Sequence, residues 1–167
     1  MILAIDVHYK ETTAKAVGAL IQHWEDAVAK QYIIKYIDDV EEYVPGAFYK
    51  RELPCIVEIL KDIDLRSLHY IIIDGFVVLD DSGKPGLGGY VHESIQQQVP
   101  VIGVAKTNFH QNEQHVIPVL RGASANPLYV TAIGTDVHQA AEHIKAMHGE
   151  FRLPTVLKEM DRITKEP

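Results

Sequence analysis

Two runs of apolar residues in this chain end in an aspartate. One run covers residues 68–75 and ends in Asp74 and Gly75; the other opens the chain and ends at Asp6. Four consecutive bulky apolar residues before Asp74 predict a strand that is buried on both faces. Because a charge is costly to bury without a partner, we expect both aspartates to project from strand ends into one shared cleft. A turn or helix-cap position is the alternative explanation for each aspartate taken alone.

The first part of the chain is rich in strand-forming segments. Strands are predicted over residues 2–7 and 12–21 and, within residues 27–37, over 31–37, where β-branched and aromatic residues concentrate. The connections between them are too short for crossover helices, so the three strands are expected to form an antiparallel meander. An acidic, turn-prone segment at residues 38–46 follows.

Helical and strand-like patterns alternate in the rest of the chain. From about residue 47 to 63 the apolar spacing is helical, with Leu53, Ile56, Val57 and Leu60 on one face. The further predicted elements are the Asp74 strand, a glycine-rich loop at 81–89, a short helix through 93–96, a strand at 99–104, a hairpin of 115–121 with 127–132, and helices at 136–148 and 154–164. No linker or repeat interrupts this order, so residues 1–167 are predicted to form one domain.

Three antiparallel strands followed by alternating helices and parallel strands is the element order of an RNase H-like fold. The predicted class is therefore α/β, a mixed sheet flanked by helices. A flavodoxin-like sheet would instead alternate strand and helix from its first strand onward.

Composition narrows the class of protein further. The chain is 47% hydrophobic, and no stretch approaches the roughly 20 apolar residues that a membrane span requires. A net charge of −7 argues against a broad basic surface for nucleic acid but leaves room for a local groove. The single cysteine, Cys55, lies in an apolar run and is expected to be a buried thiol. With no signal peptide in evidence, a reduced cytoplasmic protein is expected.

Several segments together resemble the endonuclease V family. The resemblance is collinear over essentially the whole chain, and the ordered set is specific although each motif alone is weak. The segments are Ala4-Ile5-Asp6-Val7-His8-Tyr9, residues 43–52 (Tyr-Val-Pro-Gly-Ala-Phe-Tyr-Lys-Arg-Glu), Ile72-Ile73-Asp74-Gly75, residues 99–106, Pro127-Leu128-Tyr129-Val130, and Phe151-Arg152-Leu153-Pro154 followed by Asp161-Arg162.

The resemblance implies an endonuclease with an RNase H-like fold that cleaves DNA or RNA near deaminated purines, chiefly inosine, and serves DNA repair. It implies Mg²⁺ as cofactor, for which Mn²⁺ can substitute, held by Asp6, Glu52 and Asp74. Lys106 corresponds to a lysine that lies near the active site in the family. The segment Tyr43, Val44, Pro45 and Gly46 corresponds to a tip that wedges into the nucleic acid at the modified base.

These residue types suit the hydrolysis of a phosphodiester. Mg²⁺ takes hard oxygen ligands and keeps some of its waters, so two or three carboxylates are enough to hold it. Lys106 is expected to neutralise the phosphate or to orient a water; a solvated lysine at a strand end is the alternative. For Glu52 the alternative is an exposed helix acid, and for the Pro45-Gly46 tip it is an ordinary turn.

Two family motifs are altered in this chain. The His-Pro-Arg segment expected after the Asp74 strand is replaced by residues 76–86, which carry Asp80 and Asp81. Thr135 stands where the family has the histidine of Pro-Gly-His, with Asp136 and His138 nearby; Asp136 is expected to cap its helix, and a fourth metal ligand is the alternative.

Two functions therefore remain open at this point. The first is a Mg²⁺-dependent nuclease with altered substrate recognition, and the second is a catalytically degenerate relative that binds nucleic acid, a nucleotide or a protein. A plain nucleotide-binding α/β protein is the weaker third reading, because the chain has no phosphate-binding Gly-x-x-x-x-Gly-Lys-Ser/Thr loop.

Overall fold

Three antiparallel strands begin the chain, as its hydrophobic pattern predicts. They are β1 (Ile2–Lys10), β2 (Thr13–Ile21) and β3 (Gln31–Ile37), with β2 paired to both of the others. The structure is a computed structural model that describes residues 1–40, 42, 44–45, 47, 49–108 and 111–167.

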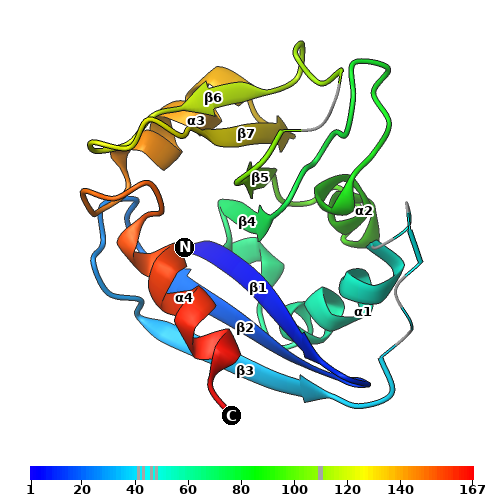
Figure 1. The fold of residues 1–167 in the computed structure, drawn as a ribbon. Coiled ribbons are helices and arrows are strands. Elements are labelled where there is room, and N and C mark those ends of the chain that lie inside the picture. Colours follow the sequence, from blue (N-terminus) through cyan, green and yellow to red (C-terminus); the bar gives the residue numbers. More distant parts are fainter. Residues whose placement is uncertain (41, 43, 46, 48, 109–110) are drawn as a thin grey trace.

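The remaining strands complete a mixed sheet of seven strands in the order β3-β2-β1-β4-β5-β7-β6 (Figure 1). β4 (Tyr70–Asp74) is parallel to β1, and β5 (Val101–Ala105) is parallel to β4. The predicted hairpin is confirmed by β6 (Ile117–Val119) and β7 (Leu128–Ile133), which pair in antiparallel fashion, with β7 also antiparallel to β5. The predicted RNase H-like α/β class is confirmed.

Helices cover both faces of the sheet (Figure 1). α1 (Tyr49–Leu60) and α2 (Leu87–Ser94) lie on one face, and α3 (Val137–Ala146) and α4 (Thr155–Lys165) lie on the other; a short 3₁₀ turn occupies Leu65–Ser67. Each face has its own apolar core, because successive residues of β1 point to opposite sides: Leu3 and Ile5 pack toward α1, and Ala4 packs toward α4.

The buried face of α1 differs slightly from the predicted one. Its fully buried residues are Cys55, Ile56, Ile59 and Leu60, whereas the expected Leu53 and Val57 are only half-buried at its margin. Cys55 is a buried free thiol, as expected.

The glycine-rich segment was predicted to be a loop as far as residue 89, and this boundary is wrong. α2 begins at Leu87, so Gly88 and Gly89 form its first turn. A Cβ on Gly88 would lie 2.6 Å from a methyl group of Val77, and one on Gly89 would lie 3.0 Å from the Val77 carbonyl oxygen. The glycines are therefore needed for close packing of the helix rather than for a turn. None of the helices in the described ranges is long and apolar enough to cross a bilayer.

Candidate active site

The sheet places the two predicted aspartates side by side. β1 and β4 are parallel, with Ile5 opposite Ile73, so the next residue of each strand, Asp6 and Asp74, emerges at the same end of the ladder. Both follow runs of buried apolar residues that anchor the strands in the core. This is the shared strand-end cleft that the hydrophobic pattern predicts.

Both carboxylates open into one small cavity, which we call the acid pocket. Its volume is about 30 Å³, enough for roughly one or two water molecules. Its wall is formed by the strand ends of β1, β4 and β5, by the loop before α4, and by α4 itself. The lining residues are Ile5, Asp6, Ile72, Ile73, Asp74, Val104, Lys106, Leu153, Leu157, Met160 and Asp161.

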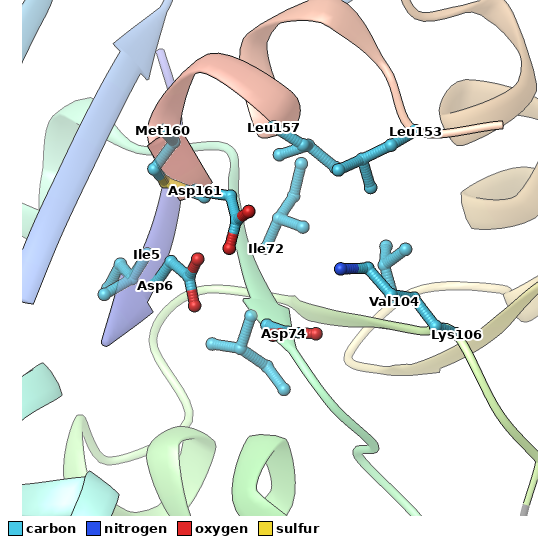
Figure 2. Close-up of a pocket in the computed structure, with 11 residues that line it drawn as sticks. Ile5, Asp6, Ile72, Asp74, Val104, Lys106, Leu153, Leu157, Met160 and Asp161 are labelled. Atoms are coloured by element: carbon cyan, nitrogen blue, oxygen red, sulfur yellow. The ribbon is translucent and has the colours of Figure 1, made fainter. Parts of the chain in front are cut away.

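Asp161 is the functional candidate that sequence reasoning did not single out. It lies on α4, where Leu157, Met160 and Asp161 follow at helical spacing and face the pocket together (Figure 2). The available signal was an acid in line with the apolar face of an amphipathic helix, a position that is normally hydrophobic. The sequence resemblance includes Asp161 only as part of a C-terminal motif, without a role.

The Asp6 and Asp161 carboxyl groups point toward one another across the pocket (Figure 2). Burial first, then the negative charges of Asp74 and Asp161, raises the pKa of Asp6 to about 7. Burial also acts to raise the pKa of Asp161, but a hydrogen bond from Lys165 at 3.0 Å and the charges of Lys165 and Lys106 outweigh it and lower this pKa. Of the facing pair, the proton is therefore favoured on Asp6, whose pKa is raised, over Asp161, whose pKa is lowered.

Asp74 lines the pocket from the end of β4. Its surroundings displace water and raise its pKa, while the positive charge of Lys106 acts in the opposite direction. The residue is nevertheless exposed, so water still reaches the carboxylate.

Glu52 does not line the acid pocket but is electrically coupled to it. It lies half-buried in the first turn of α1. Burial, followed by the charges of Asp74 and Asp6, raises the pKa of the Glu52 carboxyl to about 8. The predicted third acid is therefore near the two aspartates, on the opposite face of the sheet from Asp161.

Lys106 follows β5 and extends its amine into the acid pocket, toward the acids (Figure 2). Its backbone is held by Arg152, whose guanidinium donates to the carbonyl oxygens of Lys106 and, at 2.7 Å, of Pro127. The loop that carries Arg152 is itself held by the buried Arg121, which donates to the carbonyl oxygens of Phe151 at 2.6 Å and Met147 at 2.5 Å. Arg152 thus connects the segment before α4 to the end of β5, and Arg121 connects the same segment to the residues after β6.

The predicted wedge lies only partly within the described residues. Val44 and Pro45 are exposed before α1, while Tyr43 and Gly46 lie outside the described residues. Neither Val44 nor Pro45 lines the acid pocket.

The acids that replace the expected His-Pro-Arg segment have structural partners. Asp80 accepts hydrogen bonds from the Ser82 hydroxyl and amide, at 2.5 and 3.0 Å. Asp81 accepts from the amides of Glu113 and Gln114, both at 2.8 Å, and these bonds lower its pKa. Residues 80–84 are therefore a closed, acidic loop fastened to the segment at 113–114.

Asp136 caps α3, because its carboxylate accepts from the Gln139 amide at 3.0 Å. This agrees with the expected cap and leaves Asp136 outside the acid pocket. His138, two residues later, is exposed.

A divalent cation suits the donors of the acid pocket, since crowded carboxylates with raised pKa values are what a cation would neutralise. However, no three acidic, histidine or cysteine side chains of the described residues are arranged to hold one ion together. A bound cation would have to draw the carboxylates closer than they stand.

The fold and the family model point to the same group of proteins. A family model described as endonuclease V matches residues 1–162. The structure resembles a Ciona intestinalis endonuclease V solved in complex with a 23mer DNA containing an inosine followed by a ribo-adenosine, with a TM-score of 0.82 and 15% identity over 98% of this chain and 83% of that one.

Two further solved structures share the fold. Human ENDOV gives a TM-score of 0.74 and 18% identity, with 98% of this chain and 82% of that chain covered. The Streptomyces avermitilis endonuclease V gives a TM-score of 0.73 and 21% identity, with 98% of this chain and 79% of that chain covered. A search among curated proteins finds no match.

Proposed function

The chain belongs to the endonuclease V family, and from this premise we propose that it is a Mg²⁺-dependent nuclease. In this proposal it hydrolyses phosphodiester bonds near inosine or another modified base in DNA or RNA. The observation that carries the proposal is the convergence of Asp6, Asp74 and Asp161, from three separate elements, on a pocket that also receives Lys106.

We assign the metal-binding role to the pocket acids together with Glu52. Their hard oxygens match the preference of Mg²⁺, and Mn²⁺ can take the same ligands. When bound, the cation would supply an activated water and stabilise charge on the leaving oxygen. The raised pKa values of Asp6 and Glu52 fit this role, because a cation bound between two acids relieves the repulsion between their negative charges and stabilises both ionised forms.

Lys106 is proposed to bind the phosphate that is cleaved. Its amine is the positive group lining the acid pocket, and it points at the acids from the β5 side. In that position it can offset the charge of the phosphate oxygens, which grows as water adds to phosphorus and the bond to the sugar oxygen breaks. Arg152 would act through Lys106, by fixing its backbone.

The exposed tip at Val44 and Pro45, with Tyr43 and Gly46, is proposed to contact the modified base. An apolar or aromatic wedge inserted between bases unstacks them, which gives an enzyme access to one nucleotide. The proposal treats residues 1–167 as one domain and includes the DNA repair role and cytoplasmic location expected from the sequence.

The test is cleavage of inosine-containing DNA and RNA, single- and double-stranded, in Mg²⁺ or Mn²⁺. The wild type is expected to cleave at least one of these substrates, and Asp74→Asn is expected to lose that activity. Absence of cleavage by the wild type on all substrates, or equal cleavage by Asp74→Asn, would contradict the proposed reaction.

A second candidate function is a catalytically degenerate binding protein. It is favoured by the lack of a ready-made three-ligand site among the described residues and by the acidic loop at 80–84. Calorimetric titration with Mn²⁺ separates the two candidates: binding heat that Asp6→Ala abolishes supports the nuclease, and the absence of binding heat supports the degenerate relative.

A further inference from the structure

A groove runs beside the acid pocket, between the loop that joins β2 to β3 and the outer side of α4. Its volume is about 740 Å³, far larger than the pocket itself. We call it the α4 groove. Its walls are Ala27 and Val28 of the loop, Tyr32 of β3, Phe151, Leu153 and Thr155 before and at the start of α4, and Lys158, Glu159, Asp161, Arg162 and Lys165 of α4.

The α4 groove borders the acid pocket. Leu153 and Asp161 line both, so the two spaces meet at the pocket wall formed by α4. A chain-like substrate with one bond in the acid pocket therefore has the α4 groove directly beside it.

An unusually exposed aromatic ring stands at the groove. Phe151 is 66% exposed, and the Lys158 amine lies 4.8 Å from the centre of its ring. Val28, across the groove, is 75% exposed. The Lys158 amine lies over one face of the ring. An exposed aromatic ring next to a cation is the arrangement on which nucleic-acid bases stack while their phosphates are neutralised.

The α4 groove offers one cation to a phosphate. Of its three basic side chains, Arg162 pairs with Glu159 and Glu166, and Lys165 pairs with Asp161. Lys158 takes no part in the ion pairs found among the described residues, so its charge stays available for a phosphate. By contrast, the loop at 80–84 presents Asp80 and Asp81, which repel phosphates at low salt.

We propose that the α4 groove binds the unpaired stretch of nucleic-acid strand that flanks the bond in the acid pocket. This rests on the proposed nuclease function and specifies its substrate: the flanking strand must be single, because a base has to be free of its partner to stack on Phe151. Bases stack on the phenyl ring and the phosphates pass beside Lys158.

The test measures the binding of a fluorescein-labelled oligothymidylate of about 10 nucleotides. Binding is detected by fluorescence anisotropy in a Ca²⁺ buffer, so the assay does not depend on cleavage. Loss of stacking in Phe151→Ala is expected to weaken binding about tenfold, and Phe151→Trp is expected to restore it. Lys158→Met is expected to make the slope of log affinity against log salt concentration less steep, by the amount that corresponds to about one lost phosphate contact.

Tyr36 provides a matched control. It is 67% exposed, and the Lys15 amine lies 5.7 Å from the centre of its ring, but it lines another cavity, which shares only Lys165 with the α4 groove. Tyr36→Ala should leave the affinity unchanged. Because Phe151 and Tyr36 are both exposed, thermal melts of the two variants are expected to match that of the wild type.

The outcomes separate this inference from the proposed reaction. Unchanged affinity in Phe151→Ala, equal competition by a fully paired duplex, or no binding of the oligothymidylate by the wild type overturns the α4 groove as a strand site. Binding that depends on Phe151, in a protein that cleaves no inosine substrate, supports the groove and contradicts the nuclease.

Discussion

The guanidinium of Arg152 donates a hydrogen bond to the main-chain carbonyl oxygen of Lys106. Arg152 precedes α4, which carries Asp161, and Lys106 follows β5, so one side chain links the elements that bring the amine and an acid to the same pocket. A hydrogen bond from a charged donor contributes about 1.5–3 kcal/mol. We therefore expect the position of the Lys106 amine relative to the acids to depend on Arg152.

Arg152→Met is expected to slow single-turnover cleavage about tenfold while changing substrate affinity little, because a misplaced Lys106 weakens charge stabilisation during the reaction. A double-mutant cycle with Lys106→Met measures the dependence: the two losses should be clearly less than additive. Arg66→Met is the control, since Arg66 is exposed and pairs only with Asp64 among the described ion pairs. Additive losses would show that Arg152 does not act through Lys106.

Asp161→Asn is expected to reduce metal-dependent cleavage at least about a hundredfold, if the acid pocket is the catalytic centre. The matched control is Asp136→Asn, which changes an exposed aspartate that only caps α3. Asparagine caps a helix as well as aspartate does, so this variant should remain active and stable. Full activity in Asp161→Asn would remove this residue from the site.

Without divalent cations, the protein is expected to lose stability as the pH rises from about 4 to 8. The folded-state pKa of Asp6 is about 7, above its unfolded value of 3.8, so the folded state binds the extra proton across this window. That contribution is complete below the unfolded pKa and is lost as the pH rises through the folded pKa.

Asp6→Asn is therefore expected to stabilise the metal-free protein at pH 8.5 by roughly 1–2 kcal/mol, after allowance for relaxation and water access. The measurement is urea unfolding in EDTA at pH 5.5 and 8.5, where the stabilisation should be smaller at the lower pH. A variant no more stable than the wild type at pH 8.5 would mean that the ionised Asp6 carboxylate does not destabilise the folded state.

Mn²⁺ affinity is expected to rise between pH 6 and 8.5, and binding should release protons. The reason is that the carboxyl groups of Asp6 and Glu52, with pKa values of about 7 and 8, must ionise before they can act as ligands. Calorimetry in two buffers of different ionisation enthalpy counts the protons released at pH 7.5.

Glu52→Gln should release fewer protons in the same experiment. Glu58→Gln serves as its control, because Glu58 is on the same helix and pairs with Lys61 outside the pocket. Equal proton release in Glu52→Gln and the wild type would exclude Glu52 from the ligand set.

The local pattern of the chain was enough to predict the elements and two of the acids. Apolar runs ending in Asp6 and Asp74 predict strands whose tips converge, and the parallel register of β1 and β4 puts these residues side by side. Such predictions succeed because a strand buried on both faces has few alternatives: its apolar residues must enter the core and its terminal charge must leave it.

Only the tertiary structure decided the rest of the site. Asp161 reaches the pocket because α4 packs over β1 and β2 on one face of the sheet, and Glu52 lies beside the pocket without lining it, since α1 packs on the other face. Contacts such as that between Arg152 and Lys106 join residues far apart in the chain. Helical and strand periods specify which face of an element is buried, but they carry no information on how two elements are placed against each other; the packing of the whole core determines that.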